Sequence, residues 1–175
     1  MSDFIRVTMV PQNLQIYPGD AAEVSITIQN ASNVVDSFLI EVQGLDSSWF
    51  KLSVLNSSLM PRDEGSSIIT ISPPKSSDAA ARDYPITVRV ISQKDPTQET
   101  NVTGNLEVQP FYTYSLDLRP QKMTGPKGSY SVIIANNGNA ELDFALEGRD
   151  PEDLCQYRFD NRQPRVLPGR RRRFH

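Results

Sequence analysis

Residues 23–29 read EVSITIQ, and this heptapeptide decides the fold class. Val24, Ile26 and Ile28 alternate with polar residues, which is the period-2 pattern of a β-strand with one buried and one solvated face. The same alternation recurs, more weakly at the ends, in residues 5–9, 38–42, 69–71, 84–90 and 102–108. Turn-forming residues such as Pro, Gly, Asn and Asp separate these segments. About seven short strands within residues 1–108 predict an antiparallel β-sandwich.

The composition of the whole chain narrows the function classes. The 175 residues include 13 Pro and 9 Gly, too many interruptions for a helical bundle, and the formal net charge of -3 gives no overall attraction to nucleic acid or anionic membrane. A single cysteine, Cys155, excludes an internal disulfide and a Cys-based zinc site. The single histidine, His175, argues against a histidine-based site. We therefore expect no catalytic residues, no cofactor and no metal.

An internal repeat divides the chain. SITIQNASNVVDSFLIEVQGLD at residues 25–46 is echoed by SVIIANNGNAELDFALEGRD at residues 131–150. The first half aligns at an offset of 106 residues and the second half at 104, so we place a two-residue deletion in the intervening loop. Such a period predicts two copies of one sandwich. The expected fold is all-β, with tandem immunoglobulin-like (Ig-like) antiparallel sandwiches: a complete one in residues 1–108 and the N-terminal part of a second in residues 109–175.

The second copy is expected to be incomplete. Residues 109–175 contain no counterpart of the strands that follow Ile68 in the first copy. Two explanations fit: the strands belong to the rest of a longer chain, or a protein partner supplies them by β-augmentation. Half a sandwich exposes its inner face and a sheet edge, and either explanation would cover them. We favour the first explanation.

A family resemblance rests on residues 18–53. The motif consists of Pro18, Gly19 and Asp20, apolar Val24, Ile26 and Ile28, then Asn30, Gly44 and Trp49. It resembles the opening half of bacterial tandem Ig-like modules, including the cell-adhesion-related domain called CARDB and the Ig-like domain found beside α-galactosidases. DYPITVRVIS at residues 83–92 is similar to their penultimate strand. The resemblance implies spacer, adhesion or accessory modules without catalysis. The second copy departs from the motif, since residues 125–128 read GPKG and no Trp follows Gly148.

Two groups of residues are candidate binding sites. Trp49 and Phe50 could stack on a sugar ring, or Trp49 could close the end of the sandwich as a core residue, which is the interpretation we favour. The run Arg170, Arg171, Arg172 and Arg173 could bind an acidic protein partner, or it could be the solvated start of a strand. Because arginines on both faces of a strand oppose burial of either face, we expect this run to fray or to rest on an acidic surface.

Calcium is a weaker possibility. The carboxylates Asp36, Asp46, Asp63, Glu64 and Asp83 fall in expected loops, but no dense D-x-D-x-D loop is present. Nothing in the pattern indicates the paired carboxylates and shaped cleft of a glycosidase.

The sequence therefore predicts a non-catalytic structural or protein-interaction module, a spacer or scaffold within a larger protein or assembly, for which a phage-tail-like particle is one setting. The alternatives are a carbohydrate-binding or adhesive accessory module of a cell-surface protein, and an adapter that grips an acidic partner through its basic C-terminal segment. No nucleic acid is expected as a partner. MSDFIRVTMV lacks the apolar segment of a signal peptide, and no stretch approaches the roughly 18 apolar residues of a membrane span. We thus expect a cytoplasmic protein, or a cell-surface one if the chain is part of a longer secreted protein.

Overall fold

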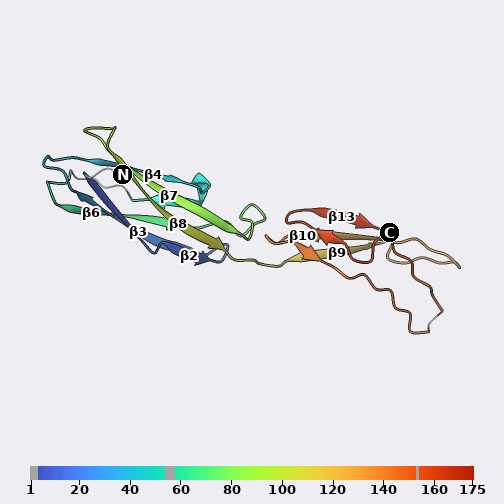
Figure 1. The fold of residues 1–175 in the computed structure, drawn as a ribbon. Helices are drawn as coiled ribbons and strands as arrows, with labels where there is room; N and C mark the ends of the chain where they lie inside the picture. The colour runs from blue at the N-terminus through green and yellow to red at the C-terminus, as the bar shows by residue number, and fades with distance from the viewer. Residues whose placement is uncertain (1–3, 54–57, 153) are drawn as a thin grey trace. The chain divides into compact units, whose positions relative to one another are not determined.

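The structure is a computed structural model that describes residues 4–53, 58–152 and 154–175 (Figure 1). Contacts between Cα atoms divide it into two units. Unit 1 comprises Met1–Pro74 and Arg82–Gln109, and unit 2 comprises Lys75–Ala81 and Pro110–His175. Among the described residues, the one helical element is the short 3-10 turn η1 (Ser47–Trp49), and no helix there could cross a bilayer. The all-β prediction is confirmed.

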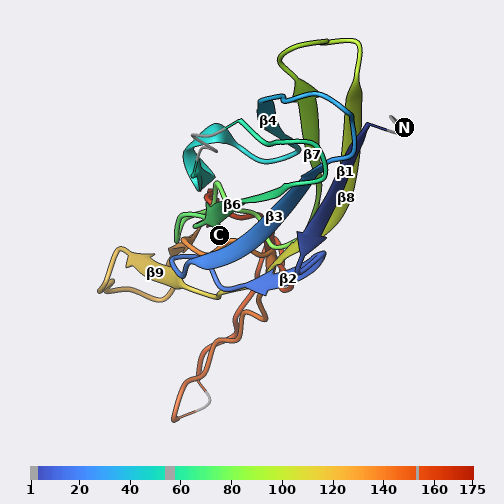
Figure 2. The ribbon, with the colours of Figure 1, turned by 90° about the vertical axis from the view of Figure 1, so that its left-hand side faces the viewer.

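Unit 1 contains two four-stranded sheets. The first has the order β1 (Ile5–Val10), β3 (Ala22–Asn30), β6 (Glu64–Ile71) and β5 (Phe50–Leu52). The second has the order β2 (Asn13–Ile16), β8 (Glu99–Val108), β7 (Asp83–Ser92) and β4 (Phe38–Gln43). All pairs are antiparallel except the parallel pair of β2 with β8. Figure 2 shows β1, β3 and β6 in a layer separate from β7 and β8, an arrangement consistent with an Ig-like sandwich.

The core of unit 1 lies between the two sheets. Val24, Ile26 and Ile28 of β3 are buried as the period-2 pattern predicts, and so are the alternate apolar residues of β7. β8 covers the inner face of β1: a Cβ on Gly104 of β8 would collide with the side chain of Met9. Strand alternation therefore produces two faces that cover each other.

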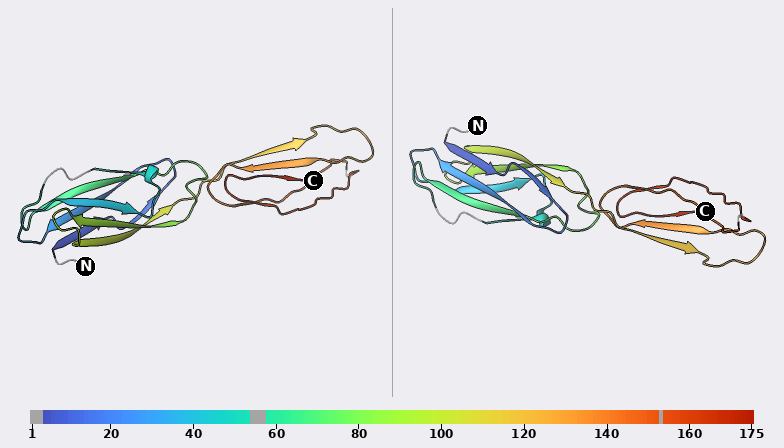
Figure 3. Two further views of the ribbon diagram at one scale, coloured as in Figure 1. Left: turned by 90° about the horizontal axis from the view of Figure 1, so that it is seen from above. Right: turned by 90° about the horizontal axis from the view of Figure 1, so that it is seen from below.

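Unit 2 contains a three-stranded sheet and a short two-stranded one. The first has the order β13 (Arg171–Phe174), β10 (Ser131–Asn136) and β9 (Tyr114–Arg119), and all its pairs are antiparallel (Figures 1 and 3). The second pairs β11 (Leu142–Asp143) with β12 (Arg165–Val166). Backbone hydrogen bonds extend this ladder, because the N–H of Phe144 donates to Pro164 O at 3.0 Å and the N–H of Leu146 donates to Arg162 O at 2.9 Å.

The arginine run does not fray. Residues 171–174 form β13, which pairs with β10 in the register Ala135 to Arg171 through Val132 to Phe174. Our sequence-based expectation assumed that a covering layer would desolvate one face of the strand. Arg172 is instead exposed, so its guanidinium keeps its hydration while the backbone completes the ladder.

The boundary between the units is also less simple than a cut after residue 108. Residues 75–81 belong to unit 2, where Asn139 holds them: its Nδ2 donates to Ala79 O at 2.8 Å, and its backbone oxygen accepts from the N–H of Ala81 at 3.0 Å. Ala79 is fully buried there. A contiguous division of the sequence cannot represent this insertion.

Candidate protein-interaction face

A buried asparagine closes the loop after β3. Asn30 has no exposed surface, and its Nδ2 donates to Val34 O at 2.8 Å and to Leu59 O at 2.9 Å. Its Oδ1 accepts from the N–H of Ser32 at 3.0 Å. Its backbone oxygen accepts from the N–H of Arg62 at 2.7 Å. One side chain thus ties the end of β3 to two other segments.

Asn136 makes the same set of bonds in unit 2. Its Nδ2 donates to Ala140 O at 2.8 Å and to Val166 O at 2.9 Å, and its Oδ1 accepts from the N–H of Gly138 at 3.0 Å. Its backbone oxygen accepts from the N–H of Gly169 at 2.9 Å. Gly169 has φ 66°, close to the 71° of Arg62 in unit 1. The two asparagines therefore occupy equivalent positions.

These bonds correct our placement of the gap in the repeat. Asn30 and its acceptor Val34 correspond to Asn136 and Ala140, so the offset of 106 continues through the loop without a deletion. The second acceptors, Leu59 and Val166, lie 107 residues apart. The change in offset is one residue and falls later in the chain.

The strand registers match as well. Ile28 pairs with Val7 and Gly65 in unit 1, and Ile134 pairs with Leu116 and Arg172 in unit 2. Strands β9, β10 and β13 therefore correspond to β1, β3 and β6. Further along, the N–H of Ser53 donates to Ile68 O at 2.8 Å, and the N–H of Asp160 donates to His175 O at 2.9 Å. The described part of unit 2 contains no counterpart of β7 or β8.

Without those strands, an apolar face stays open. Ile5 and Met9 of β1 are 3% and 4% exposed, whereas their counterparts Tyr114 and Leu118 are 54% and 45% exposed. Leu116, between them, is 56% exposed. Tyr114 makes an edge-on contact with Phe144, with ring centroids 5.2 Å apart. We call Tyr114, Leu116 and Leu118 the open face. Exposed apolar surfaces of this type occur at protein and membrane interaction sites and in ligand-binding grooves.

The neighbouring strand also has an open edge. Since the N–H groups of Phe144 and Leu146 point toward Pro164 and Arg162, the backbone groups of Asp143, Ala145 and Glu147 point the other way. The side chains of these three residues are exposed, and no hydrogen bond of Ala145 is found in the part of the chain that the structure describes. We call residues 143–147 the open edge. In unit 1 the corresponding edge of β4 is paired with β7.

In unit 1, opposite charges on the outer face of the second sheet join β7 to its two neighbouring strands. Arg89 Nη1 lies 3.3 Å from Glu41 Oε2 of β4, and Arg89 Nε donates to Glu99 Oε2 of β8 at 2.9 Å. The hydrogen bond to Glu99 and the charges of Glu99 and Glu41 raise the pKa of Arg89. By the 106-residue offset, Glu147 is the counterpart of Glu41. Glu147 is well exposed and contacts only Arg149, at 3.5 Å, among the described ion pairs.

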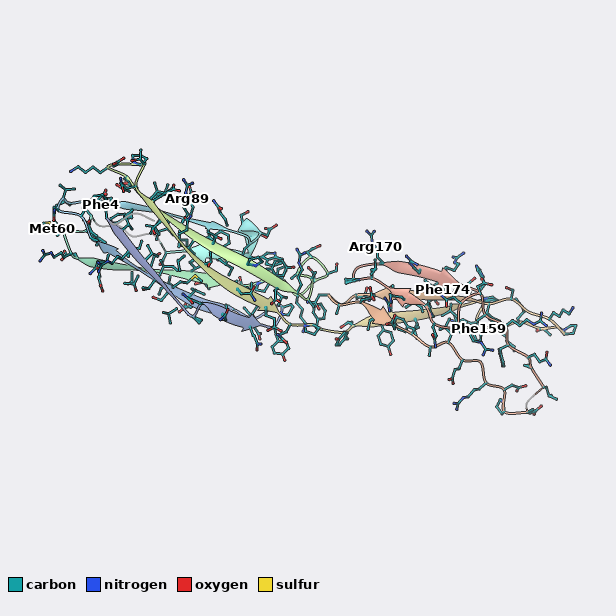
Figure 4. The ribbon with its side chains drawn as sticks, in the orientation of Figure 1. Phe4, Met60, Arg89, Phe159, Arg170 and Phe174 are labelled. Carbon is teal, nitrogen blue, oxygen red and sulfur yellow. The ribbon has the colours of Figure 1, made fainter. Side chains whose placement is uncertain are left out.

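The four predicted arginines are not gathered into one site. All four are exposed, and none makes an ion pair within the described ranges. Figure 4 shows Arg170 extending away from the ribbon. Arg172 shares the side of the sheet with Leu116 and Ile134, while Arg171 and Arg173 lie on the other side.

Trp49 is a core residue rather than an open platform. The residue is 5% exposed, and its indole meets the Tyr84 ring edge-on, with centroids 5.1 Å apart and an interplanar angle of 69°. Phe50 is half-buried and pairs with Ile71 at the edge of the first sheet. The geometry agrees with the packing interpretation, because it leaves no indole face open to a sugar.

Two of the five carboxylates expected in loops begin strands instead, Glu64 in β6 and Asp83 in β7. Asp36, Asp46 and Asp83 bind neighbouring protein groups. Asp46 caps η1 by accepting from the N–H of Ser48 at 2.8 Å, and its hydrogen bonds with Ser48 lower its pKa. Asp83 accepts from Asn105 Nδ2 at 2.9 Å, and Asp36 accepts from Ser92 Oγ. Within the described ranges, no cluster of three or more His, Cys, Asp or Glu residues could hold a metal ion.

The sequence predicted an exposed inner face and an exposed sheet edge in the second copy, but it did not identify the residues of the open face and the open edge. The YSLDL alternation at residues 114–118 was the available signal, since it is typical of a half-buried strand. It does not reveal exposure, because exposure depends on which strands lie opposite.

Cys155 gives a prediction about thiol reactivity. Its thiol is exposed, and hydrogen bonding to the Asp150 carboxylate, together with the charge of that carboxylate, raises its pKa. The backbone N–H groups of Glu152 and Leu154 hold the pKa of Asp150 low, so the carboxylate stays charged. A raised thiol pKa means less thiolate at a given pH, so Asp150→Asn should speed alkylation by iodoacetamide at pH 8 several-fold. Rates for Asp160→Asn, the control, should match those of the unmodified chain; equal rates for all three proteins would contradict the assignment.

Comparison with known proteins leaves the family open. No family model matches the chain, and no curated protein matches it. Among solved structures, a C. elegans MSP family member, WR4, is 11% identical with a TM-score of 0.40, covering 58% of this chain and 96% of its own. The E. coli chaperone DraB is 11% identical with a TM-score of 0.39, covering 97% and 85%. A protein of unknown function from Porphyromonas gingivalis W83 is 12% identical with a TM-score of 0.38, covering 96% and 80%. At such low identities and TM-scores these likenesses carry no argument about function, and the resemblance to CARDB-type modules stays a prediction.

Proposed function

We propose that the chain is a non-catalytic structural module made of two Ig-like repeats, which acts through protein–protein contact at its second repeat. The observation that carries the proposal is the exposure of the open face at positions whose counterparts in unit 1 are buried. The matched bonds of Asn30 and Asn136 support the assignment of both units to one repeat type.

The physical basis is the cost of leaving an apolar sheet face and a sheet edge in water. Large apolar side chains contribute about 1.5–3 kcal/mol each when they are fully buried rather than exposed. An open strand edge also offers backbone donors and acceptors to another polypeptide. A β-strand contact here would thus be stabilised in two ways. The open face supplies apolar surface to bury, and the open edge supplies backbone hydrogen bonds. The module would serve as a spacer or scaffold in a larger protein or assembly.

Site-specific photo-crosslinking in the cells that make the protein tests this function. A benzophenone amino acid at exposed Ala145 is expected to yield a covalent adduct with a polypeptide segment outside residues 1–175, identified by mass spectrometry. The same amino acid at Asn101, exposed on β8 of unit 1, is the control and should give no matching adduct. Absence of any peptide adduct at Ala145 would sink the proposal.

A further inference from the structure

We infer that the open edge and open face of unit 2 together bind a β-hairpin with the chemistry of β7 and β8, supplied from outside residues 1–175. The inference rests on the proposed function and specifies the partner's chemistry. The first strand of the hairpin pairs antiparallel with residues 143–147, and the second covers Leu116 and Leu118.

The backbone geometry sets the register of the first strand. In unit 1, β4 pairs with β7 so that Glu41 lies opposite Arg89, and Ser37 O accepts from the N–H of Gln93 at 2.9 Å. The 106-residue offset places Asp143 at the position of Ser37 and Glu147 at that of Glu41. The backbone groups of residues 143, 145 and 147 already point to the open side, so a strand can pair there without rearranging the ladder.

The open face calls for the second strand. In unit 1, β8 lies against β1 so closely that Gly104 has no room for a Cβ beside Met9. Leu118 is the counterpart of Met9 and is exposed. A single strand paired with the open edge would correspond to β7. It would leave β9 uncovered, because in unit 1 the counterpart of β9, strand β1, is covered by β8. A hairpin fills both positions.

Charge specifies one residue of the hairpin. Glu41 on the outer face of β4 binds Arg89 of β7, and Glu147 occupies the equivalent position on the open edge. A basic residue opposite Glu147 would make the same cross-strand pair, and opposite charges there favour pairing.

Arg172 does not prevent the hairpin from covering the inner face. It lies on the inner side of edge strand β13, where its long stem lets the guanidinium reach water.

A second copy of this chain is a poor source of the hairpin. Both edges of β7 are already occupied, one by β4 and the other by β8, and β8 is paired on its far edge with β2. Supplying this hairpin would require another copy to dismantle its own sandwich. The occupant is therefore a segment with alternating apolar residues and one outward basic residue that is not committed to a sheet of its own.

Peptide binding to the full 175-residue chain tests the inference. The probe is a fluorescein-labelled peptide with the sequence of residues 83–108, followed by fluorescence anisotropy. We expect saturable binding, weakened at least tenfold by Ala145→Pro, because proline removes a backbone donor from the open edge. Ala145→Ser is the matched control and should bind as the unmodified chain does.

A charge swap checks the register. Glu147→Arg should weaken binding of the probe several-fold, and a probe carrying Arg89→Glu should recover it. Glu23→Arg, at an exposed position on β3, should change neither affinity.

Three results would overturn the inference. The first is no saturable binding of the probe, and the second is equal binding by Ala145→Pro and Ala145→Ser. The third is a dimer of the free chain in sedimentation, because a second copy would then cover the open face. An adduct at Ala145 in cells without probe binding would leave the proposed function standing and reject the hairpin. Probe binding without a cellular adduct would show that unit 2 accepts such a hairpin, and it would reject the proposed contact in cells.

Discussion

Asn30→Ala is expected to lower the free energy of unfolding of unit 1 by about 3 kcal/mol. The substitution removes an amide whose Nδ2 serves the backbone oxygens of Val34 and Leu59 and whose Oδ1 serves Ser32. A buried polar group left without a partner costs about 1–3 kcal/mol. The bond to Leu59 is buried and the bonds to Val34 and Ser32 are part-buried, so the loss of all three together is expected to reach about 3 kcal/mol. Urea unfolding followed by the fluorescence of Trp49, the single tryptophan, measures the loss within unit 1.

Two further variants isolate the cause. Asn101→Ala, at an exposed position on β8, should stay within about 0.5 kcal/mol of the unmodified chain. Asn30→Asp keeps the size of the side chain but turns a carboxylate toward two carbonyl oxygens, so it should cost at least as much as Asn30→Ala. A loss below about 1 kcal/mol for Asn30→Ala would show that these hydrogen bonds do not hold the loop.

The sequence predicted the strands well because alternation is a local property. Val24, Ile26 and Ile28 are buried wherever their strand packs, so the pattern alone identifies the inner face of β3. The parallel pairing of β2 with β8 was not predicted. It depends on long-range contacts that no period in the sequence encodes.

The predicted position of the gap in the repeat was wrong because alignments that differ by two residues look alike in the sequence. Moving an alignment by two residues keeps every strand side chain on the same face. Phe38 can therefore be matched with Leu142 or with Phe144 without disturbing the apolar pattern. The bonds of the buried amides, with Val34 and Ala140 as equivalent acceptors, distinguish the two alignments. The pairing of Asp36 with Leu59 and of Leu142 with Val166 agrees with them.

The candidate face could be predicted only in outline. Missing strands were inferred from the repeat, and the structure adds which residues are left open and which backbone groups point outward. Leu116 and Leu118 read as ordinary core residues in the sequence. Their exposure is a property of the layer opposite them, which residues 114–118 do not determine.

Trp49→Ala is expected to cost unit 1 about 3–5 kcal/mol, the range for truncating a large buried aromatic side chain. The indole packs edge-on against Tyr84, and the Arg82 guanidinium also lies over the Tyr84 ring, 4.6 Å from its centroid. Removing the indole leaves a cavity beside a ring pair that also contributes beyond its buried area. Since this variant lacks tryptophan, urea unfolding is followed by far-ultraviolet circular dichroism.

Graded substitutions separate packing from ligand stacking at this position. Trp49→Phe keeps an aromatic ring in the site, so it should lose less than Trp49→Ala, about 1–2 kcal/mol. Phe50→Ala, at a half-buried edge position, should also lose less than Trp49→Ala. A stacking residue would show the opposite signature, with stability unchanged in Trp49→Ala and sugar binding lost. A Trp49→Ala protein as stable as the unmodified chain would therefore contradict the core assignment, because a side chain with 5% of its surface exposed cannot be removed from a packed sandwich without cost.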